Sequence, residues 1–539
     1  MHDRAQACTP IQKVHKYAVQ SAASHASVSA AALELDVAGM QRTSPIGPAL
    51  EEPYAQAAEP ARFNWEKQWY PVAVTDDLDP SRPRAITLLG QRLVLWRGRD
   101  GDWQCFNDRC PHRLAPLSEG RIELSDGTLM CSYHGWRFAA DGTCTNIPQA
   151  ADAKANAQAC ASPRACASPR PTLQRHGLLW VWAGGGGAVA ALEAAATPPV
   201  LAAELDPEAE GLPTRTSDGR RAAMRSYYYR ELPYGWDTLV ENLTDPSHLP
   251  FSHHTVLGNR YDELAGRIEL WPLPRAEGSS ADHVGAEGRL AVGRLNPGKV
   301  QRRRFLFAAP THIGWPVLDE QGTWEVTLVT YVTPIARGRS ALFLSLAVAG
   351  EKVLPGLRLQ FLLPGWFTHH RSGLVLDGDS VLLCLQERII ADQLAAGKGG
   401  WRGRNGYYMP APADRLVAAF RAWLDGRGGG GPTSLSAGAL PPTPERKEDM
   451  LDRFNQHTRF CPSCSRALQA FQALRVAAAA AGAACLLGVA AALGGGAAIT
   501  AKAPAALASG AVLAAALFVI FGRFAQTYIY VGWDHPSNH

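Results

Sequence analysis

The sequence has no strongly basic region of the kind that binds nucleic acids. Its 53 lysines and arginines nearly balance 49 aspartates and glutamates, so the formal net charge is only +4 over 539 residues. It contains neither a basic helix nor an arm rich in lysine and arginine. Composition therefore gives no support for a nucleic-acid partner, and we expect none.

The sequence also lacks the cysteine density of a disulfide scaffold. Eleven cysteines are spread over 539 residues, and several stand in Cys-x-His, Cys-x-x-His and Cys-x-x-Cys patterns that are typical of metal or redox chemistry. There is no plant-type Cys-x4-Cys-x2-Cys ferredoxin motif. The run Gly185-x-Gly187-x-x-Ala190 formally fits a dinucleotide fingerprint, but no βαβ unit surrounds it. Electrons for any redox reaction must therefore come from another protein.

Acidic residues are missing from the segment between Arg4 and Leu33, which is rich in alanine and serine. This composition is typical of an organelle transit peptide, and no continuous apolar core marks a secretory signal. We therefore expect residues 1–60 to be a transit peptide, with a disordered tail as the alternative.

The chain is too long for one compact domain. Short β-type runs separated by Gly, Asp and Pro turns predict a small all-β domain over residues 63–184. After a linker at 185–220, mixed helical and strand-like patterns predict a larger α+β domain over 221–426. A second linker at 427–445 leads to a Cys-x-x-Cys segment at 446–470.

Two long apolar runs lie near the C-terminus, within residues 476–522, with Lys502 as the one charge between them. Each run is long enough to span a bilayer, for which about 20 residues suffice. We expect a transmembrane helical hairpin followed by a tail at 523–539, with a buried hairpin as the alternative. Arg475 and Arg523 flank the two outer ends, and positive residues tend to stay on the side from which a segment inserts.

Two motifs in the all-β domain each combine one cysteine with one histidine. They are Cys110-x-His112 and Cys131-x-x-His134, with 18 residues between them and Gly-Trp after the second. A structural zinc site would normally take its cysteines from one motif and its histidines from another. One of each per loop suits an asymmetric [2Fe–2S] cluster, with two thiolates on one iron and two imidazoles on the other. We therefore predict a Rieske-type electron carrier.

A second metal site is predicted from the pattern Asp245-x-x-His248-x4-His253. Two histidines and one carboxylate bind non-haem iron and leave positions open for O₂ and substrate. Residues five apart on a regular helix point about 140° apart, but Pro250 could break the helix and bring both rings to one metal. His254 is the competing histidine, and the spacing favours His253.

The carboxylate of this site must come from elsewhere in the chain. Asp379 precedes an apolar run that could carry it inward, and Asp377 is the fallback. Asp245 followed by proline also fits a helix N-cap with proline at the first helical position, and both roles can coexist.

These residues carry a family resemblance, together with the segments "DPSHLPFSHH", "PADRLVAAFRAWL" and "MLDRFNQHTRFCPSC". Over about residues 63–530 the chain resembles the Rieske non-haem iron oxygenases, in particular their chloroplast group around pheophorbide a oxygenase. The resemblance implies an α+β multidomain fold. This fold has an all-β Rieske domain, an α+β catalytic domain of helix-grip type with mononuclear iron, and a C-terminal transmembrane hairpin.

Carried over by position, the resemblance implies a role for each motif residue. The ligands of the [2Fe–2S] cluster would be Cys110, His112, Cys131 and His134. The ligands of the mononuclear Fe(II) would be His248, His253 and Asp379. Asp245 would form a hydrogen bond toward a Rieske histidine of a neighbouring subunit, and a homotrimer is expected.

The resemblance also implies an activity and a location. Reduced ferredoxin would deliver single electrons to the cluster, and the iron would activate O₂ beside a chlorophyll-derived tetrapyrrole. With pheophorbide a as substrate, oxygen insertion would open the macrocycle. The chain would be anchored in the thylakoid or inner envelope membrane of the chloroplast, with its catalytic domains facing the stroma.

Other functions stay open at this point. Chlorophyllide or protochlorophyllide could be oxidised at a ring methyl, or a bilin hydroxylated, by the same chemistry. A non-enzymatic alternative is a Rieske redox-sensing membrane component, but a sensor has no need of a site for O₂.

Cys461 and Cys464 lie just before the apolar hairpin. A metal site would need two further ligands, and only His457 is near in the sequence. The interpretation we favour is a thiol–disulfide switch that a stromal thioredoxin reduces, because a following helix and Arg459 would acidify the first thiol. Two reduced cysteines without a regulatory role are the alternative.

Overall fold

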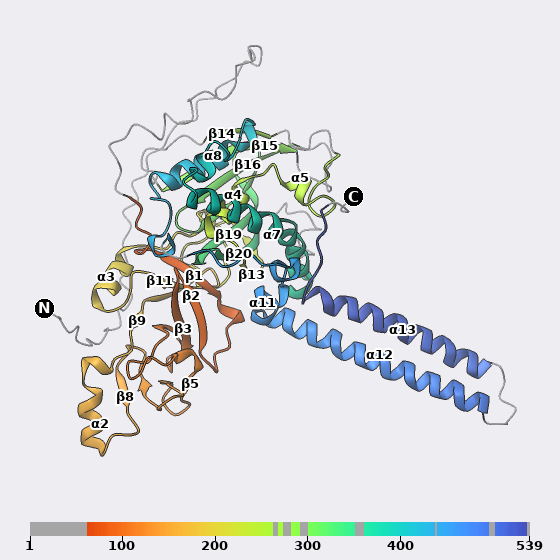
Figure 1. Ribbon diagram of the computed structural model, residues 1–539, viewed down its shortest axis with the longest axis horizontal. Coiled ribbons are helices and arrows are strands. Elements are labelled where there is room, and N and C mark those ends of the chain that lie inside the picture. The colour runs from red at the N-terminus through yellow and green to blue at the C-terminus, as the bar shows by residue number, and fades with distance from the viewer. Residues whose placement is uncertain are drawn as a thin grey trace, which may run out of the picture.

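The computed structural model describes residues 62–261, 268–272, 282–291, 300–350, 361–436, 439–494 and 502–535. The transit peptide expected at 1–60 lies outside the described residues. Figure 1 shows a body made of two parts, from which a pair of long helices projects.

The N-terminal part is built from three small antiparallel sheets with strand orders β1-β11-β10, β2-β3-β4-β9 and β5-β6-β7-β8. The strands are β1 (Trp69–Val74), β2 (Arg84–Leu88), β3 (Gln91–Arg97), β4 (Trp103–Asn107), β5 (Arg121–Ile122), β6 (Leu129–Met130), β7 (Arg137–Phe138), β8 (Cys144–Asn146), β9 (Pro169–Arg170), β10 (Thr172–Arg175) and β11 (Leu178–Trp182). One of its apolar cores contains Trp96, Phe106 and Phe138 together with Cys110 and Cys131. This core anchors the two cysteine–histidine loops.

Two helices accompany these sheets. Helix α2 (Ala153–Cys160) begins at Asp152, whose carboxylate accepts a hydrogen bond from the Ala155 N–H at 2.8 Å. Helix α3 (Ala188–Ala196) occupies part of the segment expected as a linker, and Trp69 Nε1 donates to the Ala194 carbonyl at 3.2 Å. This part of the segment is therefore packed against the first sheet.

The larger part contains a nine-stranded antiparallel sheet with the path β12-β20-β19-β17-β16-β15-β14, in which β13 also pairs with β20 and β18 with β16 and β19. The strands are β12 (Ala222–Met224), β13 (Tyr228–Leu232), β14 (Ile268–Pro272), β15 (His283–Ala291), β16 (Val300–Ala308), β17 (His312–Gly314), β18 (Val317–Leu318), β19 (Trp324–Ala336) and β20 (Arg339–Ala349). The long strands β19 and β20 pair from Val326–Val348 to Ala336–Arg339. They form the centre on which the site helices pack.

Three helices cover this sheet: α4 (Trp236–Thr244), α7 (Gly365–Ala395) and α8 (Arg415–Asp425). Figure 1 shows them in front of the strands. Trp236 of α4, Phe307 of β16 and Phe420 of α8 share one buried core, and the Phe307 and Phe420 ring centroids are 5.1 Å apart. This packing holds α4, the helix that precedes the predicted iron histidines, against the sheet and α8.

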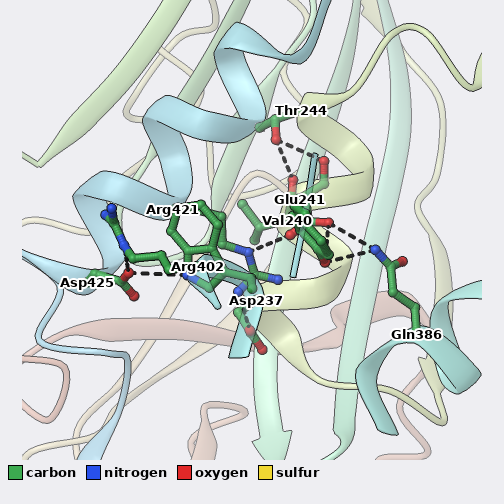
Figure 2. Close-up of polar contacts among 10 residues, drawn as sticks. Asp237, Val240, Glu241, Thr244, Gln386, Arg402, Arg421 and Asp425 are labelled. Atoms are coloured by element: carbon green, nitrogen blue, oxygen red, sulfur yellow. Dashed lines mark hydrogen bonds and ion pairs between the residues drawn. The ribbon is translucent and has the colours of Figure 1, made fainter. Parts of the chain in front are cut away.

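A buried polar network ties α4 to its neighbours (Figure 2). Arg421 of α8 donates from Nη1 to Asp237 at 2.7 Å and from Nε to Glu241, both on α4. Tyr407 donates to Glu241 at 2.9 Å and accepts from Gln386 of α7 at 2.8 Å. Since buried charges are stable only when they are paired, the network fixes the positions of α4, α7 and α8 relative to one another. It therefore fixes the end of α4, after which the predicted iron motif begins.

The projecting helices are α12 (Pro462–Gly494) and α13 (Lys502–Thr527). Short helices α9 (Thr433–Ser436), α10 (Lys447–Met450) and α11 (Arg453–Gln456) precede them. Both long helices carry 18-residue windows of mean hydropathy above 2, of which 6% is buried. They are long and apolar enough to cross a membrane. Helix α12 starts at Pro462, so the Cys-x-x-Cys motif lies at its first turn.

Candidate active site

The two cysteine–histidine motifs form a pair of matching loops. The N–H of Leu114 donates to the Cys110 carbonyl and the N–H of Gly135 to the Cys131 carbonyl, both at 2.9 Å. Leu114 and Gly135 have positive φ values of 62° and 72°, and a Cβ on Gly135 would lie 3.0 Å from a Pro148 carbon. Glycine therefore suits the tight second turn.

The four side chains of these loops are arranged asymmetrically. Cys110 and Cys131 are each 2% exposed, whereas His112 is exposed. The His112 and His134 ring centroids are 4.5 Å apart, and His112 stacks on Trp136 at 4.7 Å. Desolvation, the neighbouring His134 ring and a nearby guanidinium lower the pKa of His112, which favours the neutral imidazole that a metal requires. Inner thiols and outer imidazoles fit the donor set of a Rieske cluster.

The structure brings His248, His253 and Asp379 together, with one donor atom from each within 4.8 Å of the others. Asp379 Oδ2 lies 3.2 Å from His253 Nε2 and 3.8 Å from His248 Nε2. Both histidines flank the one-turn helix α5 (Leu249–Ser252), His248 before it and His253 after it. The two rings therefore face one point although they are five residues apart. His253 and Asp379 are buried, and His248 is partly exposed.

Close contact between α5 and α7 brings Asp379 to the histidines. A Cβ on Gly378 would lie 3.0 Å from His253 Nδ1 and 3.2 Å from the Ser252 carbonyl. Ser252 Oγ donates to Asp379 Oδ1 at 2.6 Å. Burial would raise the pKa of Asp379, but hydrogen bonds and the charges of both histidines lower it, so the carboxylate is anionic.

Asp377, the fallback ligand, has a different environment. It is fully buried between Arg230 of β13, at 2.7 Å from Nη1, and Arg453 of α11, whose Nε donates to it at 2.7 Å. Asp377 thus pairs with two guanidinium groups, and Asp379 is the carboxylate that faces the histidines.

Asp245 is not a helix N-cap as the dipeptide suggested. It is the C-cap residue of α4, and its carboxylate accepts hydrogen bonds from the N–H and the hydroxyl of Ser247. Its Oδ2 lies 3.6 Å from His248 Nδ1, on the side of the ring opposite Asp379. Burial would raise the pKa of Asp245, but the contacts with His248 and Ser247 lower it. A carboxylate behind a ligating histidine orients the ring and raises its basicity.

His254 does not join this group. Its Nδ1 accepts a hydrogen bond from the Arg260 N–H at 3.1 Å, and its ring contacts Tyr261 edge-on at 5.3 Å. The structure therefore separates the two adjacent histidines, with His253 facing the metal position.

In the sequence only His457 lies near Cys461 and Cys464, but the structure brings a second histidine to them. His369, from α7, has its Nδ1 3.5 Å from Cys461 Sγ and 3.6 Å from Cys464 Sγ. This contact could not be predicted from the sequence, because His369 lies 92 residues before Cys461 and shares no motif with it. A group of four potential metal ligands is thus present apart from the iron site, formed by His369, His457, Cys461 and Cys464.

Comparisons with known proteins agree with this geometry. A family model for the Rieske [2Fe-2S] domain matches residues 68–160, and one for pheophorbide a oxygenase matches residues 307–395. The chain is 38% identical over 446 residues to the chloroplastic pheophorbide a oxygenase of Oryza sativa subsp. japonica, over 79% of this chain and 78% of that protein. It is 32% identical over 440 residues to the chloroplastic flavonoid 8-hydroxylase 2 of Ocimum basilicum, over 77% and 76% of the two chains.

Among solved structures, dicamba monooxygenase bound to dicamba matches with a TM-score of 0.51 and 20% identity, over 68% of this chain and 98% of that one. This likeness shows a shared fold for the two parts of the body.

Proposed function

Because the chain belongs to the pheophorbide a oxygenase family of Rieske oxygenases, we propose that it opens the macrocycle of pheophorbide a in chlorophyll breakdown. The observation that carries this proposal is the convergence of His248, His253 and Asp379 in a chain that also has both cysteine–histidine loops. A redox sensor would need the loops alone, so the second metal site favours an oxygenase over a sensor.

The protein is an oxygenase whose cofactors are a [2Fe–2S] cluster and a mononuclear non-haem iron. When bound, they supply single electrons and the activation of O₂. Cys110, His112, Cys131 and His134 would hold the cluster. His248, His253 and Asp379 would hold the iron. Ser252 orients the Asp379 carboxylate, and Asp245 orients the His248 ring.

The cluster of one subunit serves the iron of a neighbouring subunit in a homotrimer. In Figure 1, β5 lies at the opposite end of the body from α5. Strand β5 follows the first cluster loop and α5 lies between the iron histidines, so the two metal sites of one chain would be far apart. Asp245 would bridge the two centres by a hydrogen bond to a Rieske histidine across the interface. Reduced ferredoxin would be the donor, since the sequence carries no ferredoxin motif of its own.

The relatives named above are chloroplastic, and two apolar helices are available as an anchor. We place the protein in the chloroplast, held by α12 and α13 in the thylakoid or inner envelope membrane. Its catalytic part would face the stroma, because Arg475 and Arg523 flank both outer ends of the hairpin.

Thioredoxin remains a proposed partner of Cys461 and Cys464. Each of these cysteines is 1% exposed, so a reductant could reach a disulfide between them only if the start of α12 opened. The pKa of Cys461 is lowered by the Cys464 thiol and by His369 and His457. Such a thiol would be the nucleophile of the pair.

The test is turnover of the purified chain with reduced ferredoxin, O₂ and a substrate panel. The panel contains pheophorbide a, chlorophyllide a, protochlorophyllide a, a bilin and a flavone, the last because of the flavonoid 8-hydroxylase relative. We expect a ring-opened product from pheophorbide a, identified by mass. Conversion of another panel member with pheophorbide a left intact would contradict the proposal.

A further inference from the structure

Four potential metal ligands that belong to neither iron site meet at the start of α12. The Cys₂His₂ cluster consists of His369 on α7, His457 after α11, Cys461 directly before α12 and Cys464 in its first turn. All four side chains are buried, with exposed fractions between 1% and 5%. One donor atom from each lies within 4.8 Å of the others.

The distances within the cluster match a tetrahedron around one ion. Zinc binds sulfur at about 2.3 Å and imidazole nitrogen at about 2.0 Å, so tetrahedral angles place sulfur and nitrogen about 3.6 Å apart. The nearest sulfur–nitrogen distances in the cluster are 3.2 Å for Cys464 and His457, 3.5 Å for Cys461 and His369, and 3.6 Å for Cys464 and His369. These three sulfur–nitrogen distances are close to the edge length of a coordination tetrahedron.

The backbone around the cluster orients its ligands. His457 Nδ1 lies 2.5 Å from the Tyr229 carbonyl and donates to it, which leaves the lone pair of Nε2 directed at Cys464. A ligating histidine commonly has its other ring nitrogen held in this way. The Ser465 N–H donates to the Cys461 carbonyl at 2.9 Å. This turn places both sulfurs on the same side of α12.

A pair of thiols that served only as a switch would not require two buried imidazoles directed at them. Four protein ligands fill a tetrahedral shell and leave no position for substrate, which is the arrangement of a structural zinc site rather than a catalytic one. Soft thiolates with imidazoles select zinc over magnesium or calcium. We propose that the Cys₂His₂ cluster binds one Zn²⁺ ion and ties α12 to α7.

The position of the cluster gives the ion a mechanical role. Helix α7 carries His369 near its start and Asp379, the carboxylate of the iron site, further along. Helix α12 continues from the cluster into the apolar hairpin. The ion would fix the angle between the hairpin and α7. Binding releases the protons of the two thiols, and a Cys461–Cys464 disulfide could form only after the ion had left.

The test is the metal content of the full chain, purified in detergent without chelators. We expect one zinc per chain in addition to about three irons, two from the [2Fe–2S] cluster and one from the mononuclear site. Cys461→Ser and His369→Ala should lose the zinc and keep the visible spectrum of the Rieske cluster. Cys485→Ser, on the same helix but outside the cluster, is the matched control and should keep both.

If the variants fail to fold, the wild-type chain alone still tests whether the Cys₂His₂ cluster binds a metal ion. Exchange of zinc for Co²⁺ should give the strong visible absorption of a tetrahedral site, with a thiolate-to-cobalt band in the near ultraviolet. The proposal is overturned if the wild-type chain holds no zinc and no such band appears. It is also overturned if iron occupies these four ligands, or if Cys461→Ser retains as much zinc as the control.

Discussion

Asp377 and Asp379 are two residues apart on α7, and the structure gives them opposite roles that one pair of variants separates. Asp377 is fully buried between the guanidinium groups of Arg230 and Arg453. Asp377→Asn leaves both cations buried without their shared carboxylate. Breaking a buried pair in this way costs about 3–5 kcal/mol. For a unit of this size we expect the Tm to fall by roughly 6–20 °C.

Asp379→Asn should act on the iron instead. The amide retains the size of the side chain but loses the charge that faces His248 and His253. We expect iron to fall from about three to about two per chain, with little change in Tm. Circular dichroism in detergent gives the Tm, and an iron assay gives the occupancy. Loss of iron from Asp377→Asn with an unchanged Tm would refute this division of roles.

Three further predictions concern the same machinery and its anchor. His253→Ala should abolish oxygenation and leave the Rieske spectrum intact, because the metals have separate ligands; His254→Ala is the control, and equal losses in both variants would count against His253. Asp245→Asn should keep both metals yet slow transfer from the cluster to the iron in single-turnover experiments, since the amide lacks the negative charge that lies 3.6 Å from His248 Nδ1; a wild-type rate would reduce Asp245 to a structural cap. Protease added to the side of sealed membranes that faces away from the stroma should leave the Rieske and iron domains uncut, and cleavage there would overturn the proposed topology.

The sequence predicts the parts of the site that are local. Each cysteine–histidine loop spans a few residues, and each closes by its own backbone hydrogen bonds, so its spacing is visible in the chain. The Asp245 to His253 motif is also local, because both histidines flank a single helical turn. The apolar hairpin follows from composition and length alone.

Contacts between distant segments leave little signal in the sequence, and Asp379 is predicted through the family resemblance and the apolar run that follows it. Helix α7 runs for 31 residues and carries His369, Asp377 and Asp379. These three residues lie in the Cys₂His₂ cluster, in a buried ion pair and in the iron site, respectively. The choice between the two aspartates depends on Arg453, 76 residues away, and on the close approach that Gly378 permits. His369 meets Cys461 only because α7 and α12 pack together. The spacing of these residues along the sequence does not indicate that Asp377 contacts Arg453 or that His369 contacts Cys461.

We propose that this chain uses O₂ to open the macrocycle of pheophorbide a. The direct test is a reaction of the ferredoxin-reduced, anaerobic protein with pheophorbide a, started by adding ¹⁸O₂ and analysed by mass spectrometry. We expect a ring-opened tetrapyrrole that carries oxygen from the labelled gas, and no such product from the His253→Ala chain. Unchanged pheophorbide a after reaction of a protein with full cluster and iron occupancy, or an open product without the label, would contradict the claim.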